Sequence, residues 1–152
     1  MRMMLFLLAM FAPGVALAAN NVTLSSAVFL EKTVADHDGR NRIVLEEPKV
    51  VTPGDRLVFI LNYRNVGNAP ASDFIVTNPL PTAVAFQGGA DSAQVSIDGG
   101  KSWGTLPAIK MRDADGRWRS ARPDDVTHVR WALKQAIPVG GQGKLSFHGT
   151  VR

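Results

Sequence analysis

Two short stretches place paired carboxylates beside a glycine, an arrangement that calcium sites often use. They are DHDG at 36–39 and DADG at 113–116. Calcium prefers clustered carboxylate and carbonyl oxygens, so either stretch could bind the ion. Neither is followed by the bidentate glutamate of a complete EF-hand loop, and Asp-Gly is also a common hairpin turn. A turn is therefore the simpler interpretation. The candidate metal ligands are Asp36, Asp38, Asp113 and Asp115.

Two histidines form a second possible metal site. His128 and His148 fall on the polar sides of two alternating segments, separated by the turn-forming stretch IPVGGQG. If that stretch closes a hairpin, the two imidazoles lie nearly opposite each other and could bind a metal with a third ligand. No third ligand is evident in the sequence. Two solvated histidines are the simpler interpretation, and we expect no metal or other cofactor.

The stretch SIDGGKSW at 96–103 could indicate an enzyme that acts on glycans. Its pattern, Ser-x-Asp-x-Gly-x-x-Trp, resembles the Asp-box of sialidases, where the box is a repeated structural hairpin away from the active site. A propeller would need several copies, and the sequence has one. A sialidase would also need a tyrosine nucleophile, whereas the single tyrosine, Tyr63, is predicted within a strand. Together with the lack of a Gly-x-Ser-x-Gly elbow, this predicts a structural turn and a non-catalytic protein.

An aromatic residue between two cations is the remaining signal for ligand or partner contact. Trp118 lies between Arg117 and Arg119 in a polar, irregular region that we predict to be a long hairpin or a surface loop. An exposed tryptophan of this kind could stack on a sugar ring or anchor a protein partner. The alternative, which the usual burial of tryptophan favours, is that the side chain folds back over the edge of the domain.

The elements that would position these residues are strands. Alternating or continuous apolar segments, separated by Gly, Pro, Asn and Asp, favour an antiparallel β-sandwich of about eight strands over a barrel. The clearest strand is 56–64, whose unbroken apolar run is typical of a central strand covered on both faces. The expected strands are 22–34, 42–45, 56–64, 72–76, 83–86, 93–98, 127–133 and 144–151. No window indicates an amphipathic helix.

Several residues between these strands are assigned to turns and architecture. Asp98 can accept hydrogen bonds from turn amides, and Trp103 can pack over the same turn. Asn65 and Gly67 suit a turn that requires a positive φ. The full set is Gly54, Asp55, Asn65, Gly67, Pro81, Asp98, Gly100 and Trp103.

The stretch from 53 to 81 carries a family resemblance. It resembles the bacterial extracellular family called domain of unknown function eleven, through a Gly-Asp pair, an aromatic strand, Asn-x-Gly-Asn-Ala and a closing Leu-Pro. The matching positions are Gly54, Asp55, Phe59, Asn65, Gly67, Asn68, Ala69, Leu80 and Pro81. Asn78 replaces the aspartate that the family usually shows. The resemblance extends over about 45–151 and implies an immunoglobulin-like sandwich outside the cytoplasm, and no reaction.

The N-terminal segment and the composition predict an exported chain. Residues 1–18 combine Arg2, a short apolar run and Ala16-Leu17-Ala18, which is typical of a cleaved signal peptide. The remainder, 19–152, would be a single domain without a transmembrane segment. It contains no cysteine, so its core must stabilise it without disulfides. Removing Arg2 leaves sixteen basic and thirteen acidic residues, a dispersed net charge of about +3 that gives no reason to expect nucleic acid binding.

These features predict a periplasmic or extracellular module with a structural or interaction role. Its partner would be an envelope or extracellular protein or a glycan, and nothing in the sequence requires more than a monomer. The alternative function is carbohydrate binding through exposed aromatic and basic loop residues.

Overall fold

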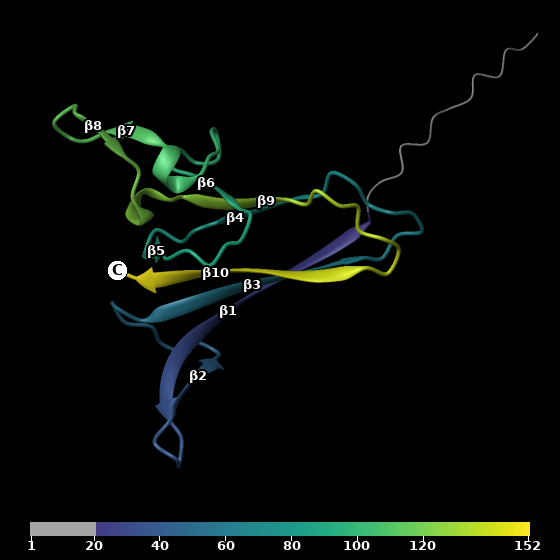
Figure 1. Cartoon of the computed structure of the whole chain (residues 1–152), viewed down its shortest axis with the longest axis horizontal. Helices are drawn as coiled ribbons and strands as arrows, with labels where there is room; N and C mark the ends of the chain where they lie inside the picture. Colours follow the sequence, from purple (N-terminus) through teal and green to yellow (C-terminus); the bar gives the residue numbers. More distant parts are fainter. Residues whose placement is uncertain (1–20) are drawn as a thin grey trace, which may run out of the picture.

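A computed structural model describes residues 21–152 as two antiparallel sheets packed face to face (Figure 1). The predicted signal peptide at 1–18 and the first residues of the predicted domain lie outside the described residues. Within 21–152 no helix is long and apolar enough to cross a membrane. The only helical segments there are two short 3-10 turns, η1 at Leu106–Ala108 and η2 at Pro123–Asp125.

The larger sheet has five strands in the order β2-β1-β3-β10-β5. Its strands are β1 (Val22–Ala35), β2 (Asn41–Glu46), β3 (Arg56–Asn65), β5 (Val84–Phe86) and β10 (Gln142–Val151). The long β1 pairs with β3 over its first part and with β2 over its second part. The hairpin of β1 and β2 therefore projects beyond the body of the sandwich (Figure 1).

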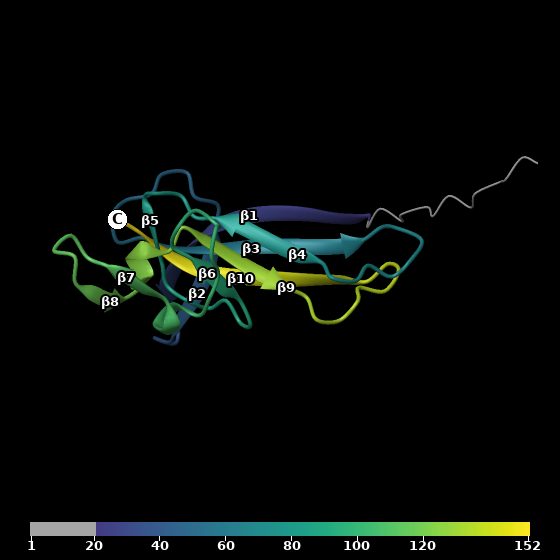
Figure 2. The ribbon, with the colours of Figure 1, turned by 90° about the horizontal axis from the view of Figure 1, so that it is seen from above.

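The smaller sheet lies across the larger one, as the view from above shows (Figure 2). It has the order β4-β9-β6, with β4 at Ile75–Pro79, β6 at Gln94–Ser96 and β9 at His128–Ala132. A separate hairpin of β7 (Lys110–Arg112) and β8 (Trp118–Ser120) extends from the end of the sandwich. The fold is thus the predicted all-β antiparallel sandwich. The two strands beyond the expected eight form a hairpin within the region predicted as a hairpin or loop.

The core lies between the two sheets and centres on Phe147. This ring stacks on Phe59 of the neighbouring strand with 4.4 Å between centroids. Trp131, from the opposite sheet, packs on it at 6.0 Å, and Phe86 packs on it at 6.2 Å. Full burial of one such side chain contributes about 2–3 kcal/mol. The alternation predicted around positions 59, 131 and 147 therefore correctly identifies the residues that join the sheets.

Two local expectations are wrong. The strand expected at 72–76 is instead β4, which begins later, because Asp73 adopts a φ of 53° and keeps the chain out of extended conformation there. The stretch IPVGGQG does not close a hairpin, because β9 and β10 belong to different sheets. Ile137 and Ala71 exchange backbone hydrogen bonds of 2.8 and 2.9 Å, and the chain crosses between the sheets at that point.

Candidate functional site

The β7–β8 hairpin is our candidate contact site, because it carries Trp118, the most exposed tryptophan among the described residues. Trp118 is 67% exposed. The alternative favoured by the usual burial of tryptophan, that its side chain folds back over the edge of the domain, is therefore wrong. The guanidinium of Arg112 lies 4.7 Å from the centre of its ring. Arg112 also donates a hydrogen bond of 3.1 Å to the carbonyl of Gly116. The indole therefore has one face against a cation and a large remaining surface open to contact.

The turn of this hairpin is built by Asp113. Its carboxylate accepts hydrogen bonds from the backbone N–H groups of Asp115 and Arg117, at 3.0 and 2.8 Å. The backbone N–H of Gly116 donates to the Asp113 carbonyl at 3.0 Å. The DADG stretch is thus an aspartate-stabilised turn, and this turn places Arg117 and Trp118 at the tip.

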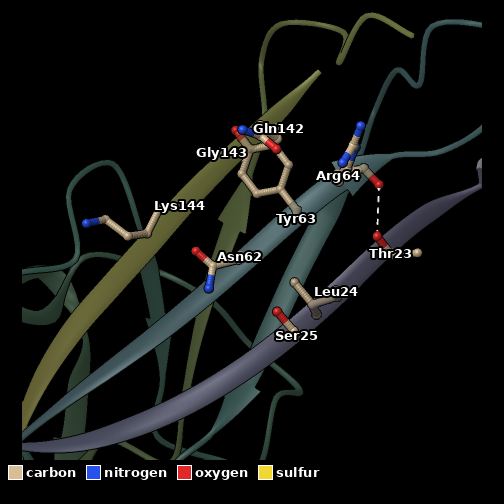
Figure 3. A pocket seen from close by; sticks show the side chains of 9 residues that line it. All are labelled: Thr23, Leu24, Ser25, Asn62, Tyr63, Arg64, Gln142, Gly143 and Lys144. Atoms are coloured by element: carbon tan, nitrogen blue, oxygen red, sulfur yellow. Dashed lines mark hydrogen bonds between the residues drawn. The ribbon is translucent and has the colours of Figure 1, made fainter. Parts of the chain in front are cut away.

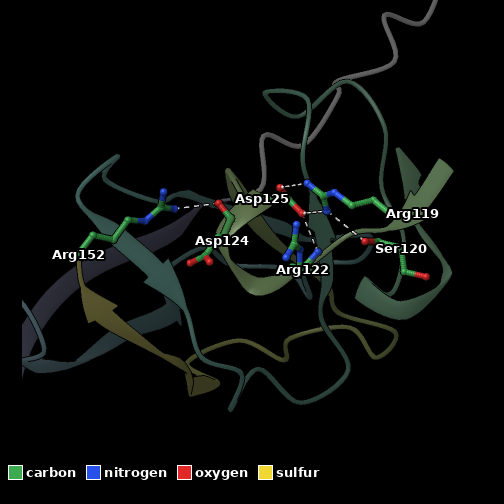
Figure 4. Close-up of polar contacts among 6 residues, drawn as sticks. All are labelled: Arg119, Ser120, Arg122, Asp124, Asp125 and Arg152. Carbon is green, nitrogen blue, oxygen red and sulfur yellow. Dashed lines mark hydrogen bonds and ion pairs between the residues drawn. The ribbon is translucent and has the colours of Figure 1, made fainter. Parts of the chain in front are cut away.

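Arg119 points away from that tip and fastens the hairpin to the sandwich (Figure 4). Its guanidinium donates two hydrogen bonds, of 2.6 and 2.8 Å, to the two carboxylate oxygens of Asp125 in η2. The hydrogen bonds from Arg119 lower the pKa of Asp125 to about 2, and the backbone N–H of Arg122 contributes a further one of 2.7 Å. Of the three predicted contact residues, Arg117 and Trp118 are exposed, whereas Arg119 anchors the hairpin.

The base of the hairpin is held by further contacts around η2. The side chain of Arg152 donates to the Asp124 carbonyl at 2.9 Å and to the Val84 carbonyl at 3.3 Å, so it connects η2 to β5 (Figure 4). Ala121, just after β8, is buried, and its N–H donates to the Ile109 carbonyl at 2.8 Å. The exposed tip therefore extends from a well-anchored base.

The Ser96–Trp103 stretch forms a compact turn around Asp98. Asp98 Oδ1 accepts hydrogen bonds from the Ser96 hydroxyl at 2.7 Å and from the N–H groups of Lys101 and Ser102 at 3.0 and 2.9 Å. Its Oδ2 accepts from the Ser102 hydroxyl at 2.6 Å. These bonds, led by those from Ser102, hold the pKa of Asp98 well below its usual range. The carboxylate is thus occupied within the turn, as predicted.

Trp103 covers the outer face of the smaller sheet next to this turn. A Cβ placed on Gly100 would lie 3.5 Å from its ring, so the tryptophan packs over the turn as expected. The guanidinium of Arg130 lies 4.2 Å from the centre of the indole, and His128 meets the ring edge-on at 6.4 Å between centroids. Arg130 also donates to Gln94 Oε1 at 2.6 Å. Trp103 is therefore half-buried and already in contact with a cation.

The two histidines are not brought together. His128 lies against Trp103, and its Nδ1 is 3.0 Å from the Thr127 hydroxyl. His148, on the larger sheet, has Nε2 3.5 Å from Glu31, whose carboxylate also pairs with Arg56 at 3.1 Å. The expectation that the histidines face each other is wrong, because it depended on a hairpin that does not form.

The other candidate ligands do not cluster either. Asp36 caps its own turn by accepting from the N–H of His37 at 2.8 Å, and the N–H of Gly39 donates to its carbonyl at 2.9 Å. Asp38, in the same turn, is exposed. Within residues 21–152 no group of three or more histidine, aspartate and glutamate side chains is placed to hold a metal ion.

The remaining architectural residues close loops at both ends of the sandwich. Asp55 accepts from the N–H of Thr52 at 2.8 Å, and Gly54, at a φ of 95°, provides the turn predicted there. Pro81 follows β4, and its carbonyl accepts from the N–H of Val84 at 2.9 Å. Asn65 is buried, and its side chain hydrogen-bonds across loops. Neither Asn65 nor Gly67 has a positive φ, so the expectation that they supply one is wrong.

A polar hollow on the larger sheet was not predicted (Figure 3). It has a volume of about 520 Å³ and lies where β1, β3 and β10 run side by side. The Tyr63 ring covers Gly143, since a Cβ at that glycine would lie 2.2 Å from the phenol oxygen. Alternation along β3 and β10 could have indicated the polar side, which carries Asn62, Arg64 and Lys144. The lining residues are Thr23, Leu24, Ser25, Asn62, Tyr63, Arg64, Gln142, Gly143 and Lys144.

Comparisons of the chain with protein-family models, curated proteins and solved structures find no match.

Proposed function

We propose that this chain is an exported, non-catalytic immunoglobulin-like module that binds a partner at the cell envelope or outside the cell. The observation that carries the proposal is the exposure of Trp118 at the tip of an anchored hairpin. Tryptophan and arginine are the residues most often found at the energetic centres of protein interfaces. An exposed indole with Arg112 and Arg117 beside it provides both an apolar surface and positive charge for contact.

The anchoring of the hairpin supports a binding role. The bidentate pair of Arg119 and Asp125 and the hydrogen bonds of Asp113 fix the hairpin before any partner arrives. A contact surface that is already ordered loses less conformational entropy on binding. The same residues explain why the tryptophan can remain exposed without its loop collapsing onto the sandwich.

The positions of the reactive side chains favour binding over catalysis. Asp98 is occupied by donors of its own turn, and the two histidines belong to different sheets. General acid–base catalysis needs titratable groups that converge on one reacting centre. Among the described residues, Asp36, Asp98 and Asp113 instead stabilise turns, and His148 lies beside Glu31.

The proposed location and family rest on the sequence. Residues 1–18 have the composition of a signal peptide, and 53–81 carry the resemblance to the domain-of-unknown-function-eleven family. A module without cysteine that folds on its aromatic core is compatible with such a location. Membership in that family and cleavage of the leader are parts of the proposal.

Carbohydrate binding is the second candidate function, and the polar hollow on the larger sheet favours it. Sugar sites use a few convergent amide, hydroxyl and charged groups, and this hollow offers Asn62, Arg64 and Lys144 on one face of the sheet. The Tyr63 ring lies on the other face, against Phe74. Arrays of envelope glycans would separate the two functions. A glycan partner should lose affinity on Asn62→Ala or Lys144→Ala, whereas a protein partner of the hairpin should not.

The direct test is affinity capture from envelope and culture-supernatant fractions with matched variants. Trp118→Ala should reduce recovery of the partner at least about tenfold, which is typical of a hot-spot tryptophan. Ile75→Ala is the control, since Ile75 is a similarly exposed apolar residue on β4. Full recovery by Trp118→Ala, or equal losses with both variants, would contradict the hairpin as the contact site.

A further inference from the structure

The edge strand β2 is open to pairing. Among residues 21–152, β2 pairs only with β1, and it lies at the rim of the larger sheet (Figure 1). The other edges are short or partly occupied. β5 has three residues, β6 exchanges hydrogen bonds of 2.8 and 3.1 Å with Gly104 through Val95, and β4 ends in Pro79.

The composition of β2 gives it little of the usual protection. Edge strands normally avoid association through proline, charged side chains (above all lysine), bulges or short length. This strand, NRIVLE, has six residues and no proline or lysine, and its two charges, Arg42 and Glu46, are of opposite sign. Ile43 is 63% exposed and Leu45 is 46% exposed, and both lie on the outer face of the sheet. An unpaired backbone edge is therefore combined with an apolar surface.

The strand is also complementary to itself. Its central residues are a cation, three apolar residues and an anion, in the order Arg42, Ile43, Val44, Leu45, Glu46. In antiparallel pairing with a second copy about Val44, each Arg42 would lie opposite the other copy's Glu46. Each Ile43 would lie opposite a Leu45. Residues that face each other across antiparallel strands share a face of the sheet, so both kinds of pair can form.

We propose that two copies of this chain associate through antiparallel pairing of their β2 strands, centred on Val44, which joins their larger sheets into one. The symmetry is two-fold, so the contact is closed and does not propagate into fibres. Opposite charges directly across strands favour this register, and the like charges of a parallel arrangement would oppose each other.

The ion pair already present on the hairpin fits the same arrangement. Lys32 Nζ lies 2.7 Å from Glu46, whereas Arg42 has no ion-pair partner within residues 21–152. In the dimer each Glu46 would lie between Lys32 of its own chain and Arg42 of the other. The β7–β8 hairpin lies on the opposite side of the sandwich and would stay accessible (Figure 1).

Charge reversal tests the proposal by sedimentation velocity of the purified full chain at low salt. Because a contact of one strand pair is at the small end of interface sizes, the measurement should span roughly 10 µM to 1 mM. The wild-type mass should rise towards that of a dimer with concentration. Arg42→Glu alone and Glu46→Arg alone should each remain monomeric, because each places like charges opposite one another.

Mixing the two variants gives the decisive result. An equimolar mixture of Arg42→Glu and Glu46→Arg should form a heterodimer, because each chain then presents one sign of charge to the other. The double variant should again form a homodimer. Arg64→Glu, at the far end of β3, is the matched control and should associate like the wild type. Circular dichroism confirms that each variant is folded.

A wild-type chain that stays monomeric throughout this range would overturn the proposal. So would a mixture that associates no more than its components, or single variants that dimerise like the wild type.

Discussion

Replacing Asn65 with alanine should destabilise the sandwich more than any other single asparagine truncation at the loop end of β3. Asn65 is 1% exposed and connects two loops. Its Nδ2 donates to the carbonyls of Ala69 and Ile137 at 2.8 and 2.9 Å, and its Oδ1 accepts from the N–H of Gly67 at 2.9 Å. One amide therefore holds the loop after β3 against the segment that crosses between the sheets.

The expected loss follows from these three hydrogen bonds. Each contributes about 0.5–1.5 kcal/mol net, and the bond to Ile137 is buried, where an unpaired group costs most. The Ile137 carbonyl keeps a second donor, the N–H of Ala71 at 2.9 Å, which limits the penalty there. We expect Asn65→Ala to lower the free energy of unfolding by about 3 kcal/mol.

Equilibrium urea unfolding, followed by tryptophan fluorescence, measures this loss. Asn68→Ala is the matched control, because Asn68 is exposed in the same loop, and it should change stability by less than about 0.5 kcal/mol. Asn65→Asp should be at least as damaging as alanine, since it directs a carboxylate at two carbonyl oxygens. A loss below about 1 kcal/mol for Asn65→Ala would refute the role assigned to this side chain.

Three further predictions concern the turns, the core and the contact site. The folded-state pKa values of Asp98 and Asp125 lie below their unfolded value, so both carboxylates stabilise the fold above about pH 4. Stability should fall as pH decreases from about 4 to 2 in thermal melts, and less steeply in Asp98→Asn, which should already melt lower at neutral pH. Gly149→Ala should cost about 1–3 kcal/mol in urea unfolding, because its Cβ would lie 2.4 Å from a buried valine methyl; an unchanged midpoint would count against the tight packing there. Trp118→Ala should leave the melting temperature within about 2 °C of the wild type, since the side chain is exposed; a large decrease would assign it to the fold.

The sequence predicts the strands that join the core and misplaces those that depend on distant contacts. The unbroken apolar run of β3 and the alternation around Trp131 and Phe147 are local patterns, and the structure has strands at both places. The sequence prediction placed this strand at 72–76, earlier than β4, because the positive φ of Asp73 is not apparent from composition. The link between β9 and β10 has the residues of a hairpin turn, but its pairing with Ala71 takes it to the other sheet.

The sequence located the candidate site, but it did not predict the separate roles of Trp118 and Arg119. A tryptophan between two arginines is visible in the chain, and two-residue periodicity separates Arg119 from Trp118. That Asp125 binds Arg119 depends on how η2 packs against the hairpin. That Trp118 stays largely exposed, with only the Arg112 guanidinium over one face, is likewise a property of the folded hairpin. The turn role of Asp98 was predictable because all its hydrogen-bond donors lie within four residues of it.

Site-specific photo-crosslinking tests the proposed contact most directly. A photoreactive phenylalanine derivative is introduced in place of Ala114, which is exposed in the turn of the β7–β8 hairpin and leaves Trp118 intact, in one version of the chain, and in place of Ile75 in another. Each is irradiated with envelope and supernatant fractions. The account predicts a discrete cross-linked partner from position 114 and none from position 75. Cross-linking that is equal at both positions, or that occurs only from position 75, would contradict the claim that the β7–β8 hairpin is the binding surface.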